Sequence, residues 1–174
     1  HADGIYGTSN KSFEGLVTMA GANKTQSATA FASDKLTAAA LLGARKNMGK
    51  YGINPSDVVY IVSQRGYYEL LEDAEFQDAN LVGNQATKLT GEIGTVFGSR
   101  VLMCDEFATP ATAKMHALAV NPRNYVIPRL RGVTIESDYE VANQRRVLVA
   151  SQRLGFADMI DGATSCHVLQ YKGS

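Results

Sequence analysis

The length, composition and charge of this chain exclude several classes of protein. With 174 residues, of which 45% are hydrophobic, the chain is long enough for one domain with a sizeable core and too apolar for a disordered one. Its 17 basic and 17 acidic residues cancel, which argues against a dedicated nucleic-acid-binding protein. No apolar run is long enough to cross a membrane, and we expect neither a signal peptide nor, with 2 cysteines, a disulfide framework.

The first part of the chain predicts a loop followed by a helix. Residues 1–30 are rich in Gly, Ser, Thr and Asn, and we expect a lead-in loop there, with a short strand or turn at residues 13–21. Ser33 has the character of an N-cap, and apolar residues then recur at helical spacing. We therefore predict a helix over residues 34–50.

A buried strand and a second helix are predicted next. Residues 58–62 read VVYIV, a β-branched run between polar flanks, which is typical of a buried strand. Ser63 is the expected cap of a helix that extends to about Leu71, and residues 76–88 are expected to form a loop. An acidic run without a basic residue overlaps the end of this helix; its members are Glu69, Glu72, Asp73, Glu75 and Asp78. Such a run is either a solvated face or a patch that meets a basic partner.

The glycine-rich stretch LTGEIGTVFGSRVLMCDEF, residues 89–107, allows two interpretations. Gly91, Gly94 and Gly98 could cradle a phosphate, or they could bend the backbone of a β-structure. A Walker loop needs Lys-Ser or Lys-Thr after its last glycine, whereas Ser99 and Arg100 follow here, and the spacing does not match a dinucleotide fingerprint. We therefore favour backbone bends at Gly94 and Gly98 that lead into a strand. The alternative is an α+β enzyme or ligand-binding domain that holds an anionic group between Gly91 and Arg100.

The last part of the chain predicts long strands. Residues 115–120 form one expected strand, and residues 121–132 form a connector that Pro122 and Pro128 stiffen. Residues 133–141, 145–157 and 164–172 alternate as strands do. Because helices come first and strands last, we predict an α+β fold with a central mixed or antiparallel sheet, flanked by two or more helices.

Residues that could carry chemistry are few and poorly placed. His116 and His167 lie inside expected strands, and adjacent Cys166 and His167 would point to opposite faces of theirs. Cys104 could meet His116 on a neighbouring strand, but no spacing supplies the further ligands that zinc needs. We therefore predict no catalytic residue, no cofactor and no metal site, and expect a protein that works through its surfaces.

The order of segments resembles a known family. FEGLVTMAG, SDKLTAAALLGARKNM, INPSDVVYIVSQRGYYELLED, GTVFGSRVLMCDEF and RRVLVASQRLGFADMIDGATSCHVLQYK follow one another as in the C-terminal part of the major capsid protein of tailed bacteriophages. Encapsulins and herpesvirus shell floors share that fold. The resemblance implies a lead-in at residues 1–30, an axial-domain core at 31–130, and strands at 131–174 that return to the peripheral domain. Because the family carries an arm, a hairpin loop and a spine helix ahead of this region, we expect a fragment.

The resemblance also implies a function and partners. It implies a non-enzymatic shell protein that forms hexamers and pentamers with itself and touches packaged DNA only weakly, in a virion assembled in the bacterial host cytoplasm. Scaffold or decoration proteins are further expected partners, and an encapsulin-like shell is an alternative. We expect the acidic run, from Glu69 to Asp78, to face arginines of the next subunit; the candidates are Arg129, Arg131 and Arg145.

Overall fold

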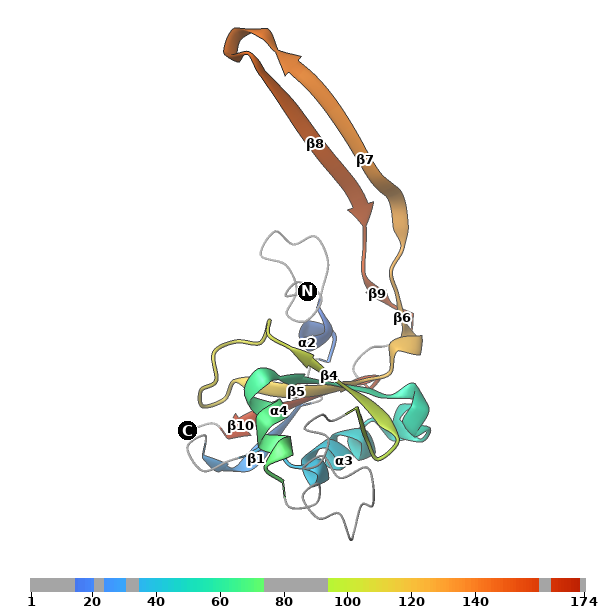
Figure 1. Ribbon diagram of the computed structural model, residues 1–174. Coiled ribbons are helices and arrows are strands. Elements are labelled where there is room, and N and C mark those ends of the chain that lie inside the picture. Colours follow the sequence, from blue (N-terminus) through green and yellow to red (C-terminus); the bar gives the residue numbers. More distant parts are fainter. Residues whose placement is uncertain (1–14, 21–23, 31–34, 74–93, 160–163, 173–174) are drawn as a thin grey trace.

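The computed structural model describes residues 15–20, 24–30, 35–73, 94–159 and 164–172. Its described part consists of a body built on one main sheet and a long two-stranded hairpin that projects from it (Figure 1). No helix among these residues is long and apolar enough to span a membrane.

The main sheet has six strands and is mixed, which is one of the two forms predicted. Its order is β1 (Lys24–Ala30), β10 (Cys166–Lys172), β5 (Met115–Val120), β2 (Val59–Ser63), β4 (Ser99–Cys104) and β3 (Thr95–Val96). The pairs β1–β10 and β2–β4 are parallel, and the remaining neighbours are antiparallel. The strands of this sheet come from all three expected segments. Strand β1 lies in residues 1–30, β5 lies in 31–130, and β10 lies in 131–174, and the three are neighbours in the order β1–β10–β5.

Two helices cover one face of the sheet. Helix α3 (Ala38–Asn47) begins four residues later than predicted, because the Thr37 side chain caps it by accepting a hydrogen bond from the Ala40 N–H. The predicted cap Ser33 lies outside the described residues. Helix α4 (Gln64–Leu71) begins as predicted, with the Ser63 hydroxyl accepting from the Gly66 N–H at 3.0 Å.

Short elements complete the body. The 3₁₀ helices η1 (Gly49–Gly52) and η2 (Pro55–Asp57) connect α3 to β2. On the other face of the sheet lies α2 (Leu16–Met19), in the region where the sequence predicted a short strand or turn.

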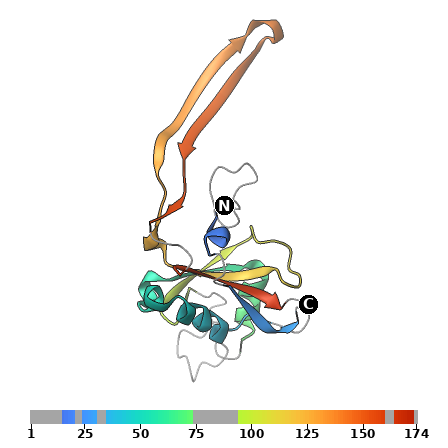
Figure 2. The same cartoon turned by 180° about the vertical axis from the view of Figure 1, so that it is seen from behind.

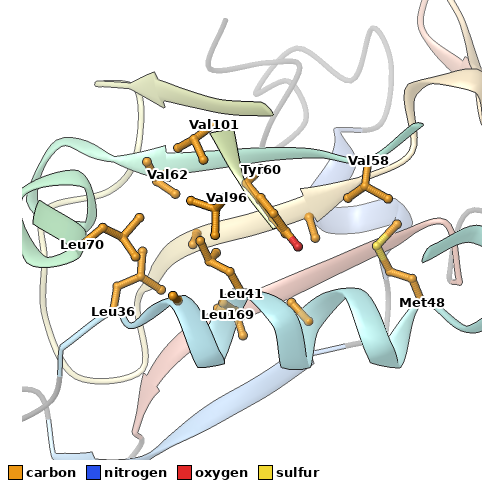
Figure 3. Packing of buried hydrophobic residues seen from close by; sticks show 14 residues of the cluster. Leu36, Leu41, Met48, Val58, Tyr60, Val62, Leu70, Val96, Val101 and Leu169 are labelled. Atoms are coloured by element: carbon orange, nitrogen blue, oxygen red, sulfur yellow. The ribbon is translucent and has the colours of Figure 1, made fainter. Parts of the chain in front are cut away.

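Alternation along the strands builds two cores, one on each face of the sheet. Tyr60 and Val62 point toward α3 and α4, where Leu41 and Leu70 meet them (Figure 3). On the opposite face, α2 packs on side chains that include Leu118. Burial on both faces explains why β2 and β5 are nearly continuous apolar runs.

The hairpin leaves the body through a short two-stranded neck. The 3₁₀ helix η4 (Pro122–Asn124) leads into β6 (Tyr125–Val126), which pairs with β9 (Ala157–Asp158). Strands β7 (Arg129–Glu140) and β8 (Arg145–Leu154) then pair antiparallel, joined by η5 (Val141–Asn143). The two long strands were predicted, but residues 121–132 are not only a connector, because they include β6 and the start of β7. Figure 2 shows the hairpin extending well beyond the body.

Candidate interaction surfaces

The glycine-rich stretch forms a tight turn between two strands. Phe97 and Gly98 both have positive φ, 48° and 78°, and they connect β3 to β4. The bend predicted at Gly98 is therefore confirmed, whereas Gly94 does not have a positive φ and Gly91 lies outside the described residues. Arg100 lies exposed on β4. A strand rather than a helix follows the turn, so the turn lacks the helix N-terminus on which the phosphate loops considered above depend.

His116, Cys166 and His167 are buried in the main sheet, where they pack as part of the body. The rings of His116 and Tyr171 stack with their centroids 4.1 Å apart. Burial raises the pKa of Cys166 to about 12 and lowers the pKa of His167. The possible meeting of Cys104 and His116 on adjacent strands is wrong, because β2 lies between β4 and β5. Among the described residues, no group of three His, Cys, Asp or Glu side chains could hold a metal ion.

The neck between body and hairpin is a packed joint. The rings of Tyr125 and Phe156 stack at 5.5 Å between centroids, and the Tyr125 hydroxyl is 2.9 Å from the hydroxyl of Ser165. Burial raises the pKa of Tyr125 to about 12, so this hydroxyl stays protonated at neutral pH. The neck thus fixes where the hairpin leaves the body.

The described part of the acidic run holds the start of α3. Glu69 is only 6% exposed, and its carboxylate accepts hydrogen bonds from the Leu36 N–H at 2.9 Å and from Arg65 Nε at 2.6 Å. Asp73 accepts from the N–H of Ala38, the first residue of α3, at 2.9 Å. A helix N-terminus leaves its first N–H groups without intrahelical partners, so Asp73, which follows α4, caps α3, while Glu69 fixes Leu36 just ahead of the helix.

The remaining acids differ in exposure. Glu72 forms an exposed ion pair with Lys35 at 2.6 Å, which lowers the pKa of Glu72 and raises the pKa of Lys35. Glu75 and Asp78 lie outside the described residues, as does the loop predicted at 76–88. Of the described members of the run, only Glu72 is exposed, and Glu69 is enclosed by the chain's own fold.

The candidate arginines all lie on the hairpin. Arg129 and Arg131 are on β7 near the neck, whereas Arg145 follows the turn at the far end. The Arg145 side chain pairs with Glu140 at 2.6 Å, and Arg131 lies 3.6 Å from Glu136. The structure does not bring these arginines to the acidic run within one chain, since the hairpin projects away from α4 (Figures 1 and 2).

The hairpin presents two chemically different faces. Residues directly opposite each other in an antiparallel pair have side chains on the same face, and successive residues alternate. The pairs Ile135–Ala150, Ser137–Leu148 and Tyr139–Arg146 therefore share one face. We call Ile135, Tyr139, Leu148 and Ala150 the apolar face; the Ile135 and Leu148 side chains are 69% and 68% exposed.

The other face carries charges. The pairs Glu136–Val149, Asp138–Val147 and Glu140–Arg145 place their side chains there. The register shifts by one residue between Arg131 and Thr134, so the pair Arg131–Arg153 lies on this face too, and Arg131 is 3.6 Å from the Glu136 carboxylate. We call Arg131, Glu136, Asp138, Glu140, Arg145 and Arg153 the charged face. Neither face was predicted from the sequence. The alternation of residues 133–141 was a signal for two different faces, but it does not say which strand lies opposite.

An exposed apolar ribbon of this kind is typical of an interface. A two-stranded hairpin alone is marginally stable in water, and contiguous exposed apolar patches mark surfaces that another protein covers. The body, by contrast, buries its apolar residues in its own two cores. The hairpin is therefore the best candidate for contact with polypeptide outside the described residues.

Known proteins resemble the chain in sequence and in fold. No family model matches. The chain is 35% identical over 144 residues to the major capsid protein of Escherichia phage T5, a match that covers 81% of this chain and 31% of that protein. The chain thus spans less than a third of the length of this curated relative.

Solved capsid and shell structures share the fold at low sequence identity. The match to the capsid of a native GTA particle covers 99% of this chain and 60% of the capsid chain, with a TM-score of 0.74 and 16% identity. The capsid of cyanophage P-SCSP1u matches 91% and 59%, with a TM-score of 0.70 and 16% identity. The SrpI encapsulin of Synechococcus elongatus matches 97% and 59%, with a TM-score of 0.61 and 12% identity. The chain is therefore a relative of the phage major capsid proteins and carries the phage capsid fold over most of its length.

Proposed function

We propose that this chain is the shell-forming part of a phage major capsid protein and acts by self-association. The observation that carries this proposal is the 35% identity to a phage major capsid protein over 81% of the chain. The exposed apolar face of the hairpin supports it, because a shell subunit must bury surface that a free monomer would expose. The role is structural and involves no enzyme activity and no cofactor.

The proposed assembly has the chain's own copies as its main partners. These copies form hexamers and pentamers within an icosahedral shell, and the shell lies in the virion after assembly in the host cytoplasm. Contact with packaged DNA is weak and independent of sequence, in keeping with a formal net charge of zero. Scaffold or decoration proteins are further partners in this proposal.

The parts of the chain have distinct proposed roles. The body with α3, α4 and the main sheet corresponds to the axial domain, and the hairpin to the returning strands of the peripheral domain. Among the candidate contacts, Arg129, Arg131, Arg145 and Glu72 are exposed and remain proposed subunit contacts. Asp73 is half-buried, and Glu69 contributes to assembly only indirectly, by holding α3 in place.

Expression of the complete coding sequence that contains this chain tests the proposal. Negative-stain electron microscopy of the purified product should show closed shells or capsomers of uniform size. A product that forms neither under any assembly condition would contradict the proposal. Protein cargo inside the particles, in place of DNA, would favour an encapsulin-like shell instead. A melting-temperature shift with phosphate or a nucleotide that Arg100→Ala abolishes would favour the anion-binding alternative.

A further inference from the structure

The charged face of the hairpin changes sign along its length. Near the neck, Arg131 lies directly opposite Arg153. Further out, Glu136 and Asp138 follow on the same face. At the far end Glu140 and Arg145 neutralise each other in an ion pair at 2.6 Å. The face is therefore basic near the neck and acidic in its middle.

The two arginines near the neck are arranged unfavourably for an isolated chain. Like charges directly opposite each other in an antiparallel pair destabilise it. Arg153 makes no ion pair among the described residues, and Arg131 reaches only Glu136, at 3.6 Å and with both side chains largely exposed. An additional anion next to these arginines would relieve the repulsion.

The acids of the same hairpin cannot fully supply that anion. Asp138 is seven residues beyond Arg131 on β7, which is roughly 23 Å along an extended strand. Within the described part of the chain, Asp138 makes no ion pair with a basic side chain. Among the described residues, Asp138 in the acidic middle therefore lacks a cation and Arg153 at the basic end lacks an anion, whereas Arg131 and Glu136 meet only in a long, exposed ion pair.

A second copy of the chain satisfies both ends at once. A nucleic acid or an acidic peptide would match Arg131 and Arg153 but would be repelled by Glu136 and Asp138 a few residues away. Two hairpins lying antiparallel, face to face, bring the basic end of each against the acidic middle of the other. Such a contact is self-complementary, as isologous interfaces are.

We propose that the charged faces of hairpins from two copies contact each other, with Arg131 and Arg153 of one copy against Glu136 and Asp138 of the other. This inference rests on the proposed function, because it names the surface through which copies associate. It also revises the earlier expectation of where the arginines find their acids: the partners lie on the hairpin rather than in the acidic run of α4. Exposed ion pairs contribute little individually, so several must act together.

Charge reversal in the 174-residue chain tests the contact. One variant combines Arg131→Glu with Arg153→Glu, and a second combines Glu136→Arg with Asp138→Arg. Each variant alone should self-associate at least about tenfold more weakly than the parent in sedimentation velocity, because like charges then face each other. An equimolar mixture of the two should associate again, since the charged face of one variant is then largely acidic and that of the other largely basic.

A matched control lies on the body. Lys46→Glu combined with Arg100→Glu changes the charge by the same four units at exposed positions away from the hairpin, and should leave self-association unchanged. Circular dichroism of every variant should show the parent's fold. High salt should weaken association of the parent, because exposed charges are screened.

Several outcomes would overturn the inference. The first is a parent chain that stays monomeric at every concentration. The second is self-association of the charge-reversal variants that equals that of the parent. The third is a mixture of the two variants that does not recover the association of the parent. If the complete coding sequence forms shells while charge reversal has no effect, the proposed function stands and only this contact is wrong. If no shells form, the proposed function itself fails.

Discussion

Replacement of Glu69 by alanine should destabilise the body strongly, even though only a single carboxylate is lost. The Glu69 side chain is only 7% exposed and accepts from the Leu36 N–H at 2.9 Å and from Arg65 Nε at 2.6 Å. Leu36 itself is 1% exposed, so its N–H would lose its partner in a place where water cannot easily replace it.

The expected loss of stability is about 2–4 kcal/mol. Each hydrogen bond to a charged group contributes roughly 1.5–3 kcal/mol, and the share of Arg65 is discounted because its side chain is 39% exposed and water can solvate it. For a chain of this size, the melting temperature should fall by about 5–12 °C. Glu69→Gln keeps one acceptor oxygen and should lose roughly half as much.

Urea denaturation followed by circular dichroism measures this loss. Glu72→Ala is the matched control, since Glu72 lies one turn further along at the end of the same helix and its ion pair with Lys35 is exposed on both sides. The control should show no resolvable change in the urea midpoint. A Glu69→Ala variant as stable as the parent, or a control that loses as much, would refute the role assigned to the buried carboxylate.

Three further predictions concern single positions in the body. Gly98→Ala should cost about 1–2 kcal/mol in urea denaturation, because φ is +78° there, whereas Gly94→Ala should be nearly neutral; equal losses would contradict the turn. Ser63→Ala should cost about 1 kcal/mol through the lost cap of α4, and a neutral result would show that the cap contributes nothing. Burial raises the pKa of Cys166 to about 12, so its thiol stays protonated at pH 8; iodoacetamide should modify half-buried Cys104 first and Cys166 only after unfolding, which mass spectrometry detects.

Local patterns predicted most strands of the body, but not β1, which lies in the expected lead-in loop at residues 1–30. Strand β5 and the start of α4 depend on features that a few neighbouring residues supply: an apolar run of β-branched and small side chains, and a serine next to free N–H groups. The start of α3 was predicted four residues too early. Ser33 and Thr37 are both good caps, and the contacts of Asp73 and Glu69 with residues 36–38 accompany the later start.

The candidate contacts were harder to predict than the strands. An acidic run and a group of arginines are visible in the sequence, but their exposure is not. Glu69 and Glu72 are three residues apart, and one is enclosed while the other is in water. Burial of a carboxylate depends on what packs over it, and here that is the start of α3, more than thirty residues earlier.

The sequence by itself determined the class of the fold, a central sheet that is mixed or antiparallel, and the family resemblance, because these depend on periodicity and on the order of segments. Only the tertiary structure decided which charges are free to meet another molecule. It placed Glu69 and Asp73 against the start of α3, and it aligned β7 with β8 so that Arg131 faces Arg153 and the apolar side chains share one face. A register shift by one residue moves every side chain of a strand to the other face, and in a hairpin the turn between the strands sets the register. The pattern of either strand taken alone therefore does not say which residues lie opposite each other.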